Sequence, residues 1–297
     1  MMPVGHLPAP GETVLCTTDY FSNAGGKGGN QAVAAVRAGG KVAMVGMVGD
    51  DSFGRRSITN LKSQSIMTTG IATSERPTGC ATIAVDAQGK NIAISAPGAN
   101  LDASAEQLPD ELFTPRNLVL TQLEVRPEEA FKVLDRAHAG GCVTILNCAP
   151  AHAVPPETLG HIDYIIMNRL EAQQFAETLG LPGASPEATA RGLVALSPNI
   201  TAIVTLEDKG AIAARGSNLY AINALHVDVV DSSGAGDTFC GIFAACLQNG
   251  HDWLIALHYA SVGASLSCLG LGAQNGAPFM EEIIKHLHEI EAPQLVP

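Results

Sequence analysis

The residues best suited to chemistry stand in one short loop, Asp231–Thr238 (DSSGAGDT), between an expected strand at Val227–Val230 and an expected helix at Phe239–Leu247. A loop of small residues that opens a helix presents free N–H groups at the positive end of the helix dipole, which suits phosphate. Within the loop, Asp237 could take a proton from an attacking hydroxyl while those N–H groups hold the phosphoryl charge. The alternative is that Asp237 only caps the helix, a common role for aspartate.

A second glycine-rich segment, Gly25–Gln31 (GGKGGNQ), also opens a helical stretch. It is not a Walker A loop, because neither Ser nor Thr follows Lys27 and the glycine spacing differs. The glycines would let a polar ligand come close to the backbone, where Lys27 offers an ammonium and Asn30 an amide as donors. The alternative is a flexible glycine-rich turn.

Short apolar runs alternate with longer helical stretches along the chain, which predicts an α/β fold: a mainly parallel sheet with helices on both faces. The expected buried strands are Val42–Val48, Asn117–Leu123, Val143–Asn147, Tyr164–Met167 and Thr201–Leu206. The expected helices are Asn30–Ala38, Arg126–Ala139, Glu171–Leu179, Pro186–Leu196 and a closing amphipathic helix at Pro278–Glu291.

Two stretches break this rhythm. Thr78–Ser95 contains two β-rich runs joined around Gln88-Gly89, which predicts a hairpin, and Glu12–Tyr20 is a candidate strand with no helix behind it. Strands without crossover helices do not easily join a parallel sheet, so we expect a small β-lid that could cover a site. The alternative is a surface flap with no catalytic part. The resulting division is a lid of residues 1–20 and 78–95 and an α/β core of residues 21–77 and 96–297.

The composition limits the partners and the compartment. A net charge of −12 argues against nucleic-acid and anionic-membrane surfaces, which need a basic patch. The sequence has no apolar run long enough to span a membrane, and Met1–Pro10 lacks the features of a secretion signal. Seven scattered cysteines without a CxxC pair favour reduced thiols, so we expect a cytoplasmic protein.

The two glycine-rich segments, taken with five further motifs, resemble the ribokinase family of carbohydrate kinases (the PfkB group). The motifs occur in the family's order over nearly the whole chain: LTQLE at Leu120–Glu124, NCAPA at Asn147–Ala151, NRLE at Asn168–Glu171, TLEDKG at Thr205–Gly210 and GAQ at Gly272–Gln274. Within the family, the GGKGGNQA, QLE and NCAPA strings look closest to the ribokinases. The resemblance favours the catalytic interpretation of Asp237 over the capping one.

The resemblance implies a doubly wound ribokinase-like fold and ATP-dependent phosphorylation of a sugar hydroxyl, with D-ribose, converted to D-ribose 5-phosphate, as the expected sugar. Asp237 would be the general base, with the amides of Gly234, Ala235 and Gly236 as its anion hole. The sugar contacts would come from Gly26, Lys27, Asn30 and Glu124. Nucleotide, phosphate and Mg²⁺ contacts would come from Asn168, Glu171, Thr205, Gly210, Gly236 and Ser261. A K⁺ site would use Asp231, Ser233 and carbonyls near Gly270 and Gly272.

The resemblance also implies a homodimer formed through the lid. Two alternatives remain open: a kinase for another sugar or a nucleoside (fructose, ketodeoxygluconate or adenosine), and a catalytically weak sugar- or nucleotide-binding relative.

The chain departs from the family pattern at its start and near the nucleotide. The family begins with a buried strand that ends in a Gly-Ser-x-Asn-x-Asp segment, whereas Met1–Glu12 matches only the region after that segment, so we expect the first strand to be missing. Its loss would remove two sugar contacts, each worth about 1–3 kcal/mol if a buried partner is left unpaired. A misassigned start and a truncated form both account for this. Ser261 replaces a usual Asn and Glu207 a usual Gly, which affects nucleotide preference.

Overall fold

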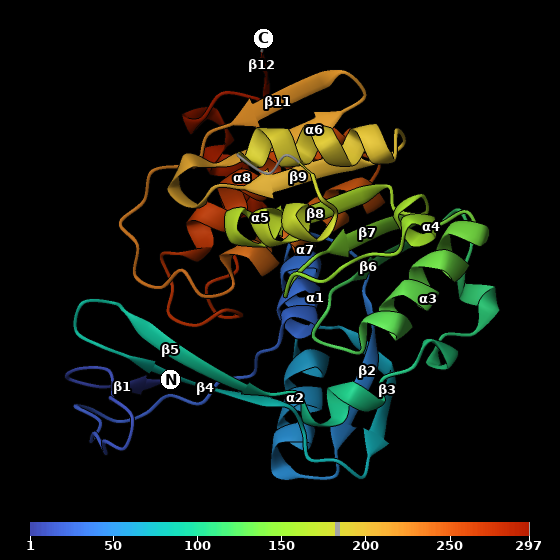
Figure 1. Ribbon diagram of the computed structural model, residues 1–297. Helices are drawn as coiled ribbons and strands as arrows, with labels where there is room; N and C mark the ends of the chain where they lie inside the picture. Colours follow the sequence, from blue (N-terminus) through green and yellow to red (C-terminus); the bar gives the residue numbers. More distant parts are fainter. Residues whose placement is uncertain (182–184, 297) are drawn as a thin grey trace.

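A seven-stranded mixed sheet forms the centre of the computed structural model, which describes residues 1–181 and 185–296 (Figure 1). The strand order is β12-β11-β10-β9-β8-β7-β6, in which β6 to β9 are parallel to one another and β10 to β12 join the edge in antiparallel fashion. The strands are β6 (Leu118–Thr121), β7 (Val143–Asn147), β8 (Tyr164–Asn168), β9 (Thr201–Thr205), β10 (Ala211–Arg215), β11 (Asn218–Ile222) and β12 (Gln294–Val296).

Helices cover both faces of this sheet, as the sequence predicts (Figure 1). One face carries α3 (Pro127–Ala139), α5 (Arg169–Thr178) and α6 (Pro186–Leu196). The other carries α1 (Lys27–Arg37), α7 (Ala235–Gln248) and α8 (Trp253–Ser267). The short α4 (Pro156–Leu159) and α9 (Met280–His286), with α2 (Ser52–Ser63) beside the second sheet, complete the α-helices of the described residues. Among these helices, none is both long and apolar enough to cross a bilayer.

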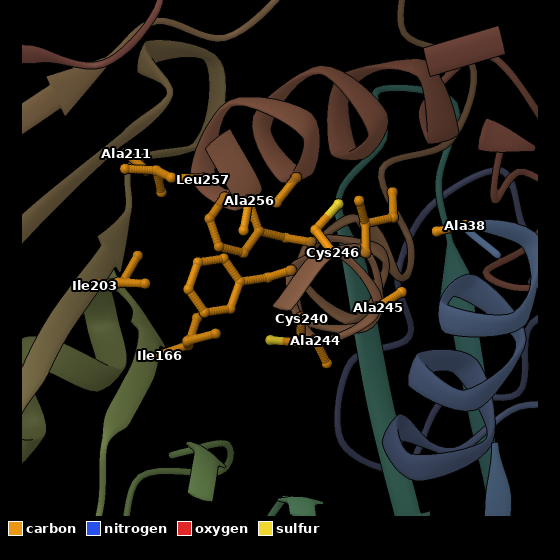
Figure 2. Packing of buried hydrophobic residues seen from close by; sticks show 14 of the residues in the cluster. Ala38, Ile166, Ile203, Ala211, Cys240, Ala244, Ala245, Cys246, Ala256 and Leu257 are labelled. Atoms are coloured by element: carbon orange, nitrogen blue, oxygen red, sulfur yellow. The ribbon is translucent and has the colours of Figure 1, made fainter. Parts of the chain in front are cut away.

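The side chains of the central strands pack into two separate cores, because successive side chains of a strand point to opposite faces of the sheet. Ile145 packs in the core under α7 and α8, whereas its neighbour Leu146 packs in the core under α3, α5 and α6. Figure 2 shows the first core, where Ile166 and Ile203 of the sheet and Leu257 of α8 surround the side chains of α7. Helix α7 is therefore enclosed by the sheet, α1 and α8, which fixes its amino-terminal end firmly.

Two smaller sheets lie beside the main one. Strands β2 (Ala43–Gly49) and β3 (Met67–Ser74) are parallel and are joined by α2 (Ser52–Ser63). Strands β1 (Met2–Pro3), β4 (Cys80–Val85) and β5 (Asn91–Ala96) form the third sheet, with β4 and β5 as the hairpin expected at Thr78–Ser95.

Two predicted strands are wrong. Of Glu12–Tyr20, Cys16 forms a single bridge to Val4 and the N–H of Thr17 donates to the carbonyl of Pro3, but no strand forms and the segment has no buried face, since Leu15 is 83% exposed. Val227–Val230 is extended but pairs with no strand: Val230 N–H donates to the carbonyl of Cys268 at the end of α8. In both cases the β-propensity is present, but the segment makes only isolated backbone bonds, to β1 for Glu12–Tyr20 and to the end of α8 for Val227–Val230, and no continuous ladder forms.

The predicted elements otherwise appear with shifts at their ends, and the ranges of β7 and α6 agree with the prediction. The shift that matters most for the site is at α7, which begins at Ala235 and not at Phe239, so that Asp237 lies in the first turn of the helix and not in the loop before it. The expected closing helix is shorter: α9 is followed by a 3-10 turn at Leu287–Glu289. Strands β2 and β6 were expected to be buried, yet most of their side chains are only half-buried. The physical reason is that each strand has a hydrogen-bonded neighbour on one side only within the described residues.

Candidate active site

The amino-terminal end of α7 presents unpaired backbone donors. Gly234 caps the helix in the left-handed conformation, with φ +79°, and a Cβ there would lie 2.5 Å from that of Ala273. The N–H of Ala235 donates to the carbonyl of Ser232 (3.2 Å). Within the described part of the chain, the N–H groups of Gly236 and Asp237 have no hydrogen-bond partner, so they can receive an anion.

The carboxylate of Asp237 lies just inside this helix end and is buried, with 7% of the residue exposed. Its Oδ2 accepts a hydrogen bond from Nδ2 of Asn30 (2.8 Å), and its Oδ1 accepts one from Nε2 of Gln31 (3.1 Å). The alternative role, capping of the helix by Asp237, is not seen: the N-cap is Gly234, and no side-chain hydrogen bond caps α7. The carboxylate is thus held by two amides of α1 and does not serve its own helix.

A close helix crossing brings those two amides to Asp237. A Cβ on Gly241, one turn after Asp237 in α7, would lie 2.3 Å from the carbonyl oxygen of Gln31 and 2.8 Å from the Cβ of Ala34. Only glycine allows α1 and α7 to approach this closely. The crossing therefore sets the distance between Asn30, Gln31 and the carboxylate.

The environment of Asp237 raises the pKa of its carboxyl above the ordinary 3.8. Burial is the main cause, since it disfavours the charged form, and the negative charge of Glu124 adds to it. The positive charge of Lys27 and the hydrogen bonds from Asn30 and Gln31 oppose the rise. A carboxyl with a raised pKa is a better proton acceptor than an ordinary aspartate, as long as it is deprotonated.

A pocket of about 170 Å³ opens in front of the helix end. Eight of the residues proposed from the sequence line it: Lys27, Asn168, Glu171, Thr205, Gly234, Ala235, Gly236 and Asp237. They come from four separate parts of the chain, at the start of α1, the carboxyl ends of β8 and β9 and the start of α7. Ligands of open α/β sheets bind at the carboxyl ends of the strands, so this is the expected edge.

Asn168 and Glu171 form a reciprocal capping box at the start of α5. Oδ1 of Asn168 accepts from the N–H of Glu171, and Oε2 of Glu171 accepts from the N–H of Asn168, both at 2.8 Å. Burial raises the pKa of Glu171, against the hydrogen bond from Asn168 and the charge of Lys27. The second carboxylate oxygen of Glu171 has no hydrogen-bond partner among the described residues. One carboxylate beside a phosphate pocket suits Mg²⁺, which keeps several of its waters.

Gly26 and Glu124 do not line this pocket, but both are close to Lys27, which does. Oε2 of Glu124 accepts a hydrogen bond from the backbone N–H of Lys27 (2.8 Å). An ideal Cβ on Gly26 would lie 3.8 Å from the same oxygen. Lys27 therefore contacts both a phosphate-sized pocket and a second carboxylate, so a polyhydroxylated substrate beside it would find both an acceptor and a cation.

The residues proposed for a monovalent cation also come together. Oδ1 of Asp231 accepts from the N–H of Ser233 (2.9 Å), and Oδ2 accepts from the N–H of Gly272 (2.8 Å). Burial raises the pKa of Asp231, but the hydrogen bonds from Ser233 and Gly272 outweigh it, so the pKa falls below 3.8 overall. These bonds connect the loop of Gly270 and Gly272 to the segment Asp231–Ser233, which leads into the amino-terminal end of α7. Carboxylate and backbone oxygens are suitable donors for a hard cation.

Two of the proposed nucleotide residues lie outside the pocket. Ser261 is buried within α8, where its hydroxyl donates to the carbonyl of Asn223 (2.9 Å). Gly210 forms the turn into β10 with φ +87°, and a Cβ there would lie 2.0 Å from the carbonyl oxygen of Ile222. Both positions are explained by packing.

Three further polar residues were missed from the sequence as members of the site. Gln31 bridges Asp237 and Oδ1 of Asn147 (3.0 Å), and Nε2 of Gln274 donates to Oδ1 of Asn30 (3.1 Å). All three are buried. Gln31 bonds to the carboxylate directly, Asn147 bonds to Gln31, and Gln274 bonds to Asn30. A signal existed for Asn147, which is a polar residue at the end of an apolar strand. Gln31 and Gln274 depend on helix and loop contacts that no local pattern reveals.

Comparison with known proteins gives one family for almost the whole chain. A family model described as pfkB family carbohydrate kinase matches residues 4–280. The ribokinase of Bacillus subtilis is 36% identical over 279 residues, which cover 93% of this chain and 91% of the relative. The deoxyribokinase of Salmonella typhi is 33% identical over 288 residues, which cover 95% and 92%.

Solved structures have the same architecture. The ribokinase of Arabidopsis thaliana, solved with ribose and ATP, superposes with a TM-score of 0.84 at 27% identity, over 96% of this chain and 94% of the other. The fold expected from the sequence, an α/β sheet of the ribokinase type with helices on both faces, is confirmed.

Proposed function

The chain belongs to the pfkB family of carbohydrate kinases, and from that premise we propose that it transfers the γ-phosphoryl group of ATP to D-ribose, giving D-ribose 5-phosphate. The observation that carries the proposal is the position of Asp237. Its buried carboxylate faces a pocket that Lys27 and Glu171 also line, next to the unpaired N–H groups of α7. A phosphoryl acceptor and a donor can meet there with a base between them.

Asp237 would act as the general base. The sugar hydroxyl gives its proton to the carboxylate as its oxygen forms a bond to the γ-phosphorus, and the bond from that phosphorus to the bridging oxygen of ADP breaks. The amides of Asn30 and Gln31 keep the carboxylate turned toward the hydroxyl. The N–H groups of Gly236 and Asp237 and the ammonium of Lys27 would stabilise the charge that develops on the phosphoryl oxygens.

Substrate contacts would divide on either side of Lys27. Glu124, Asn30 and the backbone at Gly26 would hydrogen-bond the sugar, which lies beyond the lysine from the nucleotide. Thr205 and Asn168, at the carboxyl ends of β9 and β8, would line the nucleotide side. Holding the two substrates in line supplies much of the rate in phosphoryl transfer.

Mg²⁺ fits beside Glu171 and Asn168, which would hold it largely through water, and it would neutralise phosphate charge when bound. K⁺ fits beside Asp231, and its part would be to keep the Gly270–Gly272 loop and the anion site in order. If so, Asp231→Ala lowers turnover and removes the difference between K⁺ and Na⁺ buffers. Persistence of that difference in the variant would rule out Asp231 as the cation's ligand.

The test is ADP release by the purified chain with ATP, Mg²⁺ and K⁺ and a panel of ribose, deoxyribose, fructose, ketodeoxygluconate and adenosine. The proposal predicts that ribose gives the highest kcat/KM. Silence across the panel, with nucleotide still bound, would favour a sugar- or nucleotide-binding protein instead.

A second candidate is phosphorylation of deoxyribose, because a deoxyribokinase is among the similar proteins at 33% identity. The two sugars differ by one hydroxyl. A site that hydrogen-bonds this group rejects the analogue without it, since its own polar atoms are then left unpaired. A kcat/KM for deoxyribose above that for ribose would establish the second candidate.

We also propose that the β1-β4-β5 sheet acts as a lid, formed by residues 1–20 and 78–95 over a core of residues 21–77 and 96–297. Its sheet is separate from the main one, and several of its apolar side chains are exposed, among them Leu15, Ile92 and Ile94. Exposed apolar strands of this kind favour pairing with a second lid and hence a homodimer.

A further inference from the structure

Both oxygens of the Asp237 carboxylate face N–H groups of amide side chains. Oδ2 accepts from Nδ2 of Asn30 (2.8 Å), and Oδ1 accepts from Nε2 of Gln31 (3.1 Å). An amide side chain can turn either its NH2 or its C=O toward a neighbour, whereas a carboxylate only accepts and a protonated carboxyl needs an acceptor for its proton. The orientation of the two amides therefore decides whether this position suits the charged or the neutral form of Asp237.

The main chain of β8 sets the orientation of Gln31. Nδ2 of Asn147 donates to the carbonyl of Ile166 (3.1 Å), which cannot donate in return. Oδ1 of Asn147 consequently faces Gln31 and accepts from its Nε2 (3.0 Å). Gln31 therefore presents its NH2 both to Asn147 and to the carboxylate of Asp237.

The orientation of Asn30 is set by two further amides, those of Gln274 and Asn60. Oδ1 of Asn30 accepts from Nε2 of Gln274 (3.1 Å), and Oε1 of Gln274 accepts from Nδ2 of Asn60 (2.6 Å). Each side chain of this amide chain, Asn60–Gln274–Asn30, donates through its NH2 to the next and accepts through its carbonyl from the one before. Asn30 and Gln274 are buried, so neither can turn its amide without leaving a polar group unpaired, unless the other members turn as well.

The backbone that carries Gln274 is held by Arg37, the last residue of α1. Nη1 of Arg37 donates to the carbonyls of Gln274 (2.8 Å) and Ala277 (2.6 Å). Its guanidinium also lies over the ring of Phe279, 5.2 Å from the ring centroid. The main chain at Gln274 is therefore fixed relative to α1, so that only the direction of its amide remains to be set.

The outer end of the amide chain lies on α2, which connects β2 to β3 (Figure 1). Asn60 is half-buried, and the neighbouring Leu61 packs in one cluster with Ala32 and Val33 of α1. The amide chain therefore connects the helix of the β2-β3 sheet to the carboxylate at the start of α7.

We propose that Asn60 and Gln274 are positioning residues of the reaction proposed above: through the amide chain they keep donors turned toward the carboxylate of Asp237. Neither of them lines the pocket in front of α7, so within the described residues they act on the base only through Asn30. Both carboxylate oxygens then meet donors, which favours the charged carboxylate, the form that can accept a proton. Burial raises the pKa of Asp237, and the hydrogen bonds from Asn30 and Gln31 oppose that rise. These roles rest on the proposed function in one respect, since they assume that Asp237 is the base.

The titratable groups around Asp237 are separate from the amide chain. Besides burial, which raises the pKa of its carboxyl most, Lys27 of α1 lowers this pKa and Glu124, after β6, raises it. Glu171 of α5 lines the same pocket, and Cys240, one turn along α7, is a buried thiol whose pKa is raised mainly by burial. Within the described residues none of these groups is hydrogen-bonded to the two outer members of the amide chain, so a change there leaves them in place.

The test is Asn60→Asp, a substitution of nearly the same shape at a half-buried position. A carboxylate there only accepts, so the NH2 of Gln274 would turn to it, the amide of Asn30 would follow, and the carbonyl of Asn30 would face Asp237. That arrangement suits the protonated carboxyl, so the pKa of Asp237 should rise. The measurements are the ¹³C NMR titration of the Asp237 carboxyl, which does not need turnover, and the acid limb of kcat/KM for ribose. We expect both to move to higher pH, with kcat/KM on the acid limb lower by about tenfold.

Two matched variants separate the direction of the amides from added charge and from the loss of a bond. Gln64→Glu adds the same charge one turn further along α2 and can still accept from Nε of Arg37 (3.1 Å). Its kcat/KM on the acid limb should stay within about twofold of the parent, because a distant charge is screened. Asn60→Ala removes the outer donor and reverses nothing, so we expect a lower Tm and an acid limb close to that of the parent.

An unchanged titration of the Asp237 carboxyl in Asn60→Asp would overturn the proposal. An equal shift in Gln64→Glu would also overturn it, since added charge alone would account for the change. So would an equal shift in Asn60→Ala, because the loss of a bond would then be sufficient. A shifted titration in a chain without sugar-dependent ADP release would leave the amide chain in place and count against the proposed reaction alone.

Discussion

Asp237 is a carboxylate that the fold buries and then supports with two amides, Asn30 and Gln31. Burial raises its pKa, and the charge of Lys27 limits the rise. A base works in its deprotonated form, so kcat/KM should fall as the pH decreases through the pKa of the folded protein, which lies above the ordinary 3.8.

Lys27 provides a test of this electrostatic balance. In Lys27→Met the opposing charge is lost, the pKa of Asp237 rises further, and the acid limb of the kcat/KM profile moves to higher pH. Lys27→Arg keeps the charge and should leave the limb where it is. The measurement is the pH profile of ADP release at saturating ATP. Identical acid limbs in the Met variant and the parent would show that Lys27 does not act on the base.

The titratable residues of the site could be predicted from the sequence, but the polar side chains that bond around them could not. Asp237, Lys27 and Glu171 stand in recognisable strings, so their chemistry could be predicted. Gln31 and Gln274 stand in the GGKGGNQ and GAQ strings, but their partners come from tertiary contacts between α1, α7 and the loop after α8, which the strings alone do not show. Ser261 was placed near the nucleotide by its alignment with a motif, whereas its hydroxyl serves the packing of α8.

Among the elements, the turn into α7 matters most because it aims the unpaired N–H groups. Gly234 has φ +79°, which other residues adopt at a cost of about 1–3 kcal/mol, and a Cβ would also collide with Ala273. Gly234→Ala should therefore lower Tm and turnover together. Gly236→Ala is the matched control, since Gly236 has an ordinary φ and a Cβ there would meet no atom within 4 Å. We expect its stability to stay within about 0.5 kcal/mol of the parent. Equal Tm values for the two variants in thermal unfolding would contradict this description of the turn.

Elements with a clear hydrophobic pattern were the most predictable. The ranges of β7 and α6 match because hydrophobic periodicity and a Ser-Pro helix start define them. Val227–Val230 and Glu12–Tyr20 have strand-like composition, but a strand also needs a continuous ladder of backbone bonds to a neighbour, and composition does not report one. Conversely, β2 and β6 have the composition of buried strands and yet face an open groove.

For the whole molecule, the lid predicts the oligomeric state. Ile94 is 70% exposed on β5, and a charge there would oppose lid-to-lid pairing. We expect the parent to be a dimer by light scattering at micromolar concentration and Ile94→Asp to be a monomer. Ile284→Asp, on α9 and 52% exposed, is the control and should remain dimeric. A parent that is monomeric throughout would contradict the dimer.

The claim that unites these scales is that Asp237 takes the proton from the sugar. The direct test is Asp237→Asn, with turnover and ATP affinity measured on the same preparation. General-base catalysis contributes about 10²–10⁴-fold, so ribose-dependent ADP release should fall by that factor while ATP binding stays within a few-fold. Turnover equal to that of the parent would contradict the assignment and return Asp237 to a structural role.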